Sequence, residues 1–194
     1  MKGLIREALL SGVKLRQQCV DRLDDDLLAA ADVMVKSLQA GGKVLVCGNG
    51  GSAADAQHFA GELVNRFEMN RPGLAAVAMT HDASVITSIA NDFSFDAIYA
   101  RQTEALGRPG DVLLAISTSG DSPNVVNAVK KAEEIGMDVI ALTGRDGGKL
   151  GKDSAVTVHL NINHPSTPRV QEMHITCLHI LCTLIDETMF GQLK

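Results

Sequence analysis

The sequence has no tryptophan and few aromatic side chains of any kind. Its 194 residues include five Phe and one Tyr, so that aromatic residues make up 3% of the chain. Hydrophobic residues nevertheless amount to 45%, which is the ordinary share for a globular protein. The core must therefore be built from aliphatic side chains.

Long apolar runs and clusters of positive charge are also missing. No run approaches the roughly 18 apolar residues of a membrane span, and the amino terminus, MKGLIREALLSG, is charged where a signal peptide is apolar. The 18 Lys and Arg residues are scattered among 23 Asp and Glu residues, and the net charge is −5. We therefore expect a cytoplasmic protein whose partners include neither nucleic acid nor a membrane.

Paired cysteines are absent as well. Cys19, Cys47, Cys177 and Cys182 show no C-x-x-C spacing, so we expect small buried thiols and no disulfides. Cys47 directly precedes a glycine-rich loop, which would suit a nucleophile or a packed side chain. Free cysteines are usually buried, and packing is therefore the favoured interpretation.

Five short aliphatic runs alternate with longer helical patterns from residue 42 onward. The runs are nearly continuous in apolar character, as strands buried on both faces should be, and most of the gaps between them are long enough for helical crossovers. This pattern predicts an α/β protein with three α/β/α layers and a parallel sheet. The predicted strands are residues 43–47, 74–79, 111–117, 138–143 and 155–160.

The helices have readable ends. A helix should follow the acidic run at 24–26 and stop at Gly41, another should span 122–134 behind a Ser-Pro cap, and the last should run from Pro168 to Met189. Residues 1–41 precede the first strand as a helical extension, which should pack on the sheet, on another subunit, or on both. Nothing resembles a linker, so residues 1–194 are expected to form one domain.

Two predicted strands end in small polar loops, GNGGS (48–52) and STSGDS (117–122). Ligands of open α/β sheets bind at the carboxyl ends of strands, where free backbone N–H groups and helix dipoles favour anions. The second loop has hydroxyls but no Lys or Arg, which suits a single phosphate group. Its hydroxyls belong to Ser117, Thr118, Ser119 and Ser122.

Two nucleotide motifs are matched incompletely. The glycine loop has the G-x-G-x-x-A spacing of a dinucleotide site, but the acidic residue at the expected distance, Glu68, precedes the second strand when it should end it. The stretch GRDGGK (144–149) has one residue too few for a P-loop, and no hydroxyl follows its lysine. We therefore expect no nucleotide cofactor, and a tight turn at 144–149.

His58 and Glu62 lie four residues apart in the helical segment after the first loop, so their side chains share one helix face. Such a pair suits acid–base chemistry beside the loop, with Glu62 as the base. The spacing is equally compatible with two solvated side chains on a helix surface. Spacing alone leaves both interpretations open.

Taken together, GNGGS and STSG resemble the sugar isomerase (SIS) domain family, whose members bind phosphorylated sugars in a flavodoxin-like fold. Four further stretches, HFAGEL (58–63), ANDFSFDAIYARQ (90–102), LTGRDGG (142–148) and RVQEMHITCLHIL (169–181), are similar to those of phosphoheptose isomerases. The resemblance covers nearly the whole chain. It implies conversion of sedoheptulose 7-phosphate to D-glycero-D-manno-heptose 7-phosphate, an early step toward activated heptose for lipopolysaccharide and other surface glycans.

The resemblance also implies roles for individual residues. Glu62 and His179 would be the catalytic base and acid, and a Zn²⁺ ion would be bound by His58, Glu62, Gln171 and His179. Pro168 departs from the pattern, because some members carry Asp there. The residues implied to contact the substrate are Asn49, Gly50, Gly51, Ser52, Glu62, Asn91, Asp92, Ser117, Thr118, Ser119, Ser122 and Gln171.

One geometric difficulty concerns the metal ligands. On a regular helix Gln171 and His179 differ by about 12 Å in height and about 80° in direction. Leaning side chains, an irregular first turn near Pro168, or ligands from two subunits would resolve the conflict. We therefore expect a site at a subunit interface, which agrees with the tetrameric assembly that the resemblance implies. His174, three residues from Gln171, is a local alternative to His179.

A non-catalytic relative, the protein that binds the bacterial replication initiator, shares the fold and most of these stretches. The resemblance to that group implies that, in its members, residues unable to transfer protons replace the matches to Glu62 and His179. Both proton-transfer groups are present in this sequence. The enzyme is therefore the favoured interpretation, and the initiator-binding protein is the alternative.

Overall fold

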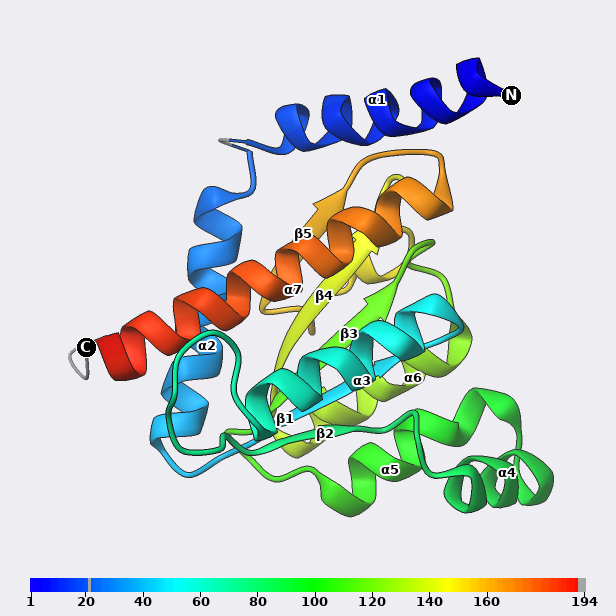
Figure 1. The fold of residues 1–194 in the computed structure, drawn as a ribbon. Helices are drawn as coiled ribbons and strands as arrows, with labels where there is room; N and C mark the ends of the chain where they lie inside the picture. The colour runs from blue at the N-terminus through cyan, green and yellow to red at the C-terminus, as the bar shows by residue number, and fades with distance from the viewer. Residues whose placement is uncertain (21, 192–194) are drawn as a thin grey trace.

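The computed structural model describes residues 1–20 and 22–191; residue 21 and residues 192–194 of the predicted domain lie outside the described residues. Within these bounds five parallel strands form one sheet in the order β2-β1-β3-β4-β5 (Figure 1). This confirms the predicted fold class, and the order is that of flavodoxin-like folds. The strands are β1 (Val44–Gly48), β2 (Ala76–Ala78), β3 (Val112–Ser117), β4 (Asp138–Gly144) and β5 (Val158–Ile162).

Burial explains which runs became strands. The central strands β1 and β3 are buried at every residue, whereas β5, at the sheet edge, alternates between buried and half-buried residues. The prediction for β5 began too early. Asp153 accepts hydrogen bonds from Ala155 N and Val156 N, and this turn delays the strand to Val158.

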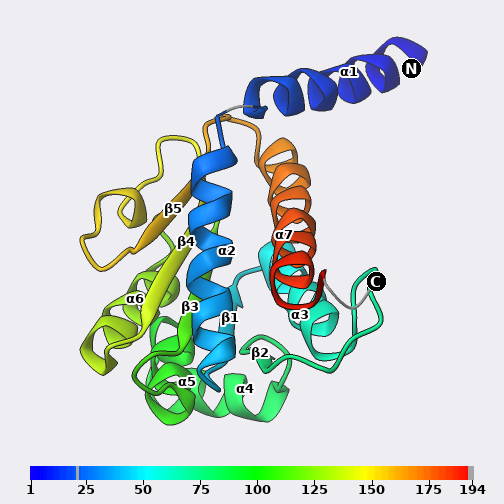
Figure 2. The ribbon, with the colours of Figure 1, turned by 90° about the vertical axis from the view of Figure 1, so that its left-hand side faces the viewer.

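Helices cover both faces of the sheet, as Figures 1 and 2 show. One face is packed by the aliphatic side chains of α2, α3 and α7, and the other by α5 and α6, with α4 beside them. The two cores are aliphatic, as the composition predicts. The helices are α2 (Asp24–Gln39), α3 (Gly51–Val64), α4 (Ala83–Asp92), α5 (Ile98–Leu106), α6 (Pro123–Ile135) and α7 (Thr167–Phe190), with short 3₁₀ turns η1 (Phe95–Ala97) and η2 (Leu150–Lys152).

The first helix, α1 (Lys2–Cys19), lies apart from the sheet and contacts the first part of α7 (Figure 1). Arg169 Nη1 donates to the carbonyl of Ala8 at 2.9 Å, and Leu15 and Cys19 are the buried residues of the helix. The predicted extension thus consists of two helices with different roles. α2 packs on the sheet, while α1 leaves most of its surface open.

All four cysteines are free and buried, which confirms the prediction. Cys47 is fully buried in the core between the sheet, α5 and α6, and this burial raises the pKa of its thiol to about 12, as the packing interpretation requires. None of the helices in residues 1–20 and 22–191 is long and apolar enough to cross a membrane.

Candidate active site

The two polar loops meet where the sheet order reverses. β1 and β3 are neighbours with Gly48 opposite Ile116, so the loops that follow them leave the sheet side by side. This is the switch point at which flavodoxin-like folds bind ligands. The Asn49 and Asn124 amides exchange two hydrogen bonds of 2.9 Å, and the Tyr99 hydroxyl donates to the carbonyl of Gly48.

Three hydroxyls gather in the second loop. Ser117 Oγ lies 3.0 Å from Ser122 Oγ and 3.4 Å from Ser119 Oγ. Ser122 is the N-cap of α6, yet its side chain makes no capping hydrogen bond. The hydroxyls therefore face one another beside the positive end of the α6 dipole, an arrangement that suits a phosphate group.

The turn that resembles a P-loop supports this hydroxyl loop. Gly120 has φ = +70°, and a Cβ at this position would collide with the carbonyl of Gly147. Leu150 N donates to the carbonyl of Gly120 at 3.0 Å, and Lys149 N donates to Asp121 Oδ1 at 3.0 Å. Residues 144–149 thus form the predicted turn and pack against the STSG loop.

The side chains with acid–base chemistry come from α3 and α7, which follow β1 and β5 and run side by side in the same direction (Figure 1). The Nε2 atoms of His58 and His179 are 2.8 Å apart, and His58 Nε2 lies 3.4 Å from Glu62 Oε1. Phe67 stacks on the His179 ring, with centroids 5.5 Å apart. The side chains of His58 and Glu62 are 43% and 25% exposed, which leaves them open to a ligand.

Gln171 lies elsewhere on the same helix. α7 is helical from Thr167 onward, so it lacks the irregular first turn considered for Pro168. The Gln171 amide packs against Gly51, where an added Cβ would collide with it. No hydrogen bond in the described part of the chain joins this amide to His58, Glu62 or His179, and the ligand set inferred from the resemblance is only partly assembled.

The donor chemistry around His58 is of the kind that zinc prefers, since two imidazole nitrogens face each other beside a carboxylate. Among residues 1–20 and 22–191, however, no group of three or more His, Cys, Asp and Glu side chains is arranged to hold a metal ion. Zinc thus stays a prediction.

Three other residues weighed from the sequence lie outside this cluster. His174 is fully buried and its Nε2 lies 2.9 Å from the carbonyl of Thr143, so the alternative in which it replaces His179 is wrong. Asn91 and Asp92 end α4, are exposed and bond to each other at 2.9 Å. No hydrogen bond in the described residues links either of them to the two loops.

The sequence reasoning missed several residues beside the site. Asp55 lies one turn before His58, and its Oδ2 is buried without a hydrogen-bond partner in the described residues. Burial raises the pKa of Asp55, while the nearby His58 lowers it. The three-residue spacing would have revealed Asp55, whereas nothing local points to Tyr99 or Asn124, or to Arg71, whose Nη2 donates to the carbonyl of Glu62 at 3.0 Å.

The sheet order and the paired loops define a class of α/β domains that bind anionic ligands at the switch point between β1 and β3. In agreement, the family model described as the SIS domain matches residues 11–144, more than half of the chain.

The relatives narrow the class. The sequence is 51% identical over 180 residues to the phosphoheptose isomerase of Halorhodospira halophila. The aligned region covers 92% of this chain and 91% of that protein. The structure of the Neisseria gonorrhoeae phosphoheptose isomerase matches with a TM-score of 0.90 at 46% identity, over 96% of this chain and 98% of that one. The structure of the Francisella tularensis phosphoheptose isomerase matches with a TM-score of 0.91 at 41% identity, over 95% of this chain and 97% of that one. The chain therefore belongs to the SIS domain family and, within it, to the phosphoheptose isomerases.

Proposed function

We propose that the protein is an aldose–ketose isomerase that interconverts sedoheptulose 7-phosphate and D-glycero-D-manno-heptose 7-phosphate. Family membership supports the reaction, and one observation supports the site. His58 brings Glu62 and His179 into a single cluster, because its Nε2 lies 3.4 Å from one and 2.8 Å from the other. A carboxylate and an imidazole that converge in this way can exchange protons with one substrate.

The proposed chemistry moves one proton between two carbons. The Glu62 carboxylate takes the proton from C1 of the ketose as the C2 carbonyl oxygen gains a proton, which gives an enediol. Glu62 then returns a proton to C2 while the oxygen on C1 loses its proton and becomes the aldehyde. His179, in contact with His58, carries the protons to and from the two oxygens, so atoms and charge balance overall.

The distant phosphate provides the grip that fixes the sugar. We assign it to the hydroxyls of Ser117, Thr118, Ser119 and Ser122 and to the first turn of α6. The glycine loop, Asn49 to Ser52, would contact the sugar between the phosphate and the proton-transfer pair, with Gln171 packed against it. Anchoring at both ends holds the reacting carbons near Glu62.

We further propose that Zn²⁺ is held by His58, Glu62 and His179, with Gln171 as a fourth donor. When bound, zinc would polarise the substrate oxygens as a Lewis acid. His58 then has a role of its own, since its imidazole orients the Glu62 carboxylate and the His179 ring from between them.

A homo-oligomer, which the family resemblance suggests to be a tetramer, completes the proposal. Ile5, Leu9 and Val13 are 62%, 67% and 51% exposed and follow one another every four residues, which gives α1 an apolar stripe suited to a second copy of the chain. Assembly would also give Asn91 and Asp92 a route to the substrate of a neighbouring subunit. We place the enzyme in the cytoplasm, where its product would supply heptose for lipopolysaccharide and other surface glycans.

The direct test is incubation with sedoheptulose 7-phosphate in deuterated water. The wild type should form the aldose and incorporate solvent deuterium, while Glu62→Gln should lower kcat by about 100-fold to 10,000-fold because the carboxylate base is lost. Glu133→Gln, an exposed position on α6, is the matched control and should behave as the wild type. Chelation should lower the activity, and zinc should restore it.

Each proposal has its own contrary result. A wild-type protein that neither forms the aldose nor exchanges deuterium would favour the initiator-binding alternative, which the enzyme names of the compared relatives do not support. Activity that survives chelation would refute the zinc proposal and leave the proposed isomerase reaction intact.

A further inference from the structure

Arg71 is a buried arginine in the segment between α3 and β2. Its side chain is fully buried and each of its nitrogens has a partner. Nη1 donates to the carbonyls of Leu63 and Pro72 at 2.7 and 3.1 Å, and Nη2 donates to the carbonyl of Glu62 at 3.0 Å. The guanidinium thus binds carbonyls of the last turn of α3, including that of the candidate base. Its positive charge also interacts favourably with the negative, carboxyl-terminal end of the helix dipole.

The fourth contact reaches across to α7. Arg71 Nε donates to Asp186 Oδ1 at 2.7 Å, and the Asp186 side chain is 4% exposed. Asp186 follows His179 by seven residues, close to two helical turns, so both side chains lie on the face of α7 that meets α3. Arg71 and Asp186 therefore join the helix that carries Glu62 to the helix that carries His179.

Stability alone is a weak explanation for this pair. Desolvation of two buried charges offsets much of their attraction, and apolar residues of similar volume often hold helices together as well or better. The aliphatic core between α2, α3 and α7 already supplies such packing. What an apolar contact lacks is direction, whereas the guanidinium fork fixes the angle and distance between its partners.

We propose that Arg71 and Asp186 are positioning residues that set the separation between α3 and α7, and through it the alignment of Glu62 with His179. The proposal rests on the proposed function, in which these two side chains act on one substrate. Displacement of a catalytic group by about 1 Å can lower the rate about 100-fold. The pair should therefore influence kcat more than KM, because the phosphate loop lies on β3 and α6.

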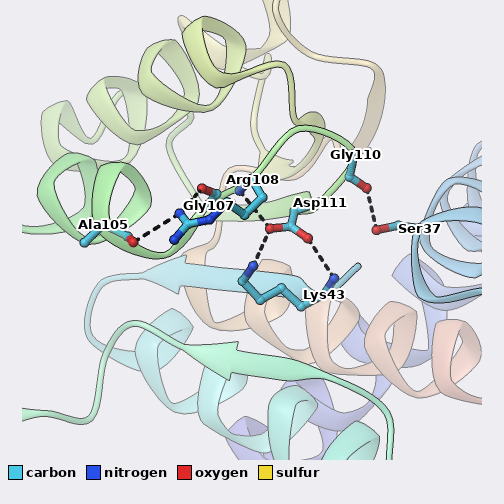
Figure 3. A network of polar contacts seen from close by, with 7 residues as sticks. All are labelled: Ser37, Lys43, Ala105, Gly107, Arg108, Gly110 and Asp111. Atoms are coloured by element: carbon cyan, nitrogen blue, oxygen red, sulfur yellow. Dashed lines mark hydrogen bonds and ion pairs between the residues drawn. The ribbon is translucent and has the colours of Figure 1, made fainter. Parts of the chain in front are cut away.

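The test compares two buried, paired carboxylates, one between α3 and α7 on one face of the sheet and the other at the amino ends of β1 and β3. Asp186→Asn removes the charge near the site and keeps the shape of the side chain. Asp111→Asn likewise removes a buried charge and keeps the shape of the side chain, but in the network of Figure 3. There Asp111 accepts hydrogen bonds from the backbone N–H and the ammonium of Lys43 and from Arg108 N. Lys43 and Asp111 directly precede β1 and β3, so this network lies at the amino edge, away from the loops.

Both variants should lower the melting temperature. Well below that temperature, Asp186→Asn should reduce kcat about tenfold or more, change KM less than about twofold, and shift the pH profile of kcat. Asp111→Asn should keep the kcat, KM and pH profile of the wild type. Arg71→Lys should change kcat, KM and the pH profile in the same way as Asp186→Asn. The double variant that combines Arg71→Lys with Asp186→Glu has a longer carboxylate and should recover part of the lost kcat.

A measurement independent of turnover separates this inference from the proposed function. In crystal structures, the distance between the His58 and His179 Nε2 atoms should increase in Asp186→Asn and stay as in the wild type in Asp111→Asn. An unchanged distance with an unchanged kcat in Asp186→Asn would overturn the inference and leave an active isomerase. Failure of both Asp186→Asn and Arg71→Lys to fold would also overturn it, because the pair would then serve the fold itself.

Discussion

His174 and His179 are five residues apart on α7, yet their surroundings differ completely. His179 contacts His58 and Phe67 at the open site, whereas His174 is enclosed and bonded to the carbonyl of Thr143. Burial lowers the pKa of His174 from 6.5 to about 4, because the interior disfavours the charged imidazolium. The two side chains look alike in the sequence, and only one of them can reach a substrate.

This burial predicts a specific loss of stability in acid. The unfolded chain protonates His174 near pH 6.5 and the folded chain only near pH 4, so stability is full above this window and falls as the pH drops through it. Up to about 3 kcal/mol should be lost, as estimated from the size of the shift. The free energy of unfolding, measured with urea at about pH 7 and about pH 4.5, should therefore decrease less between the two pH values for His174→Gln than for the wild type. The exposed His81→Gln should keep the wild-type decrease, and equal decreases in all three proteins would contradict the prediction.

At the scale of elements, the amide pair of Asn49 and Asn124 connects the glycine loop to the first turn of α6. The pair spans 75 residues of sequence, and Asn124 is 1% exposed. The Asn49 side chain is thus engaged with α6, and the two loops that would hold the sugar and its phosphate are aligned by a contact within the protein.

Loss of this contact should affect catalysis in a coupled manner. Asn49→Ala and Asn124→Ala should each lower kcat/KM. Expressed as free energies, the loss in the double variant should be smaller than the sum of the two single losses, with a coupling energy of about 1 kcal/mol. Steady-state kinetics with the phosphorylated ketose measures the cycle. Asn127→Ala, one turn further along α6 and bonded to the carbonyl of Asp96, is the control that should leave kcat/KM unchanged. Additive losses would mean that the loops are held independently.

At the scale of the whole molecule, α1 is the part that the single chain leaves incomplete. Its apolar stripe is exposed while its contacts to α7 are few, which is costly for a chain in water unless another surface covers it. The protein should therefore be an oligomer whose activity depends on assembly.

A charge in the stripe tests this expectation. Leu9→Glu should shift the sedimentation profile toward smaller species, because burial of a carboxylate in an apolar interface is unfavourable. Gln18→Glu adds the same charge nine residues later, on the opposite side of the helix, and should sediment as the wild type. A wild-type protein that stays fully active as a monomer on dilution would refute both the oligomer and the shared site.

The sequence by itself determined the fold class and the chemistry of the loops. Aliphatic runs separated by helical lengths permit little besides a parallel α/β sheet, and the carboxyl ends of parallel strands necessarily share one edge. The pairing of His58 with Glu62 on one helix face is likewise local, since it follows from helical periodicity. Such features depend on residues close together in the chain, which is why they are readable without coordinates.

Tertiary structure alone decided which distant residues meet. His58 and His179 are 121 residues apart, Arg71 and Asp186 are 115 apart, and the start of β5 depends on a turn at Asp153. Periodicity predicts which face of α7 is apolar, but the contact of that helix with α3 depends on how both pack on the same face of the sheet. The burial of His174 and the exposure of His179 follow from that packing, and so does the position of the candidate acid beside its base.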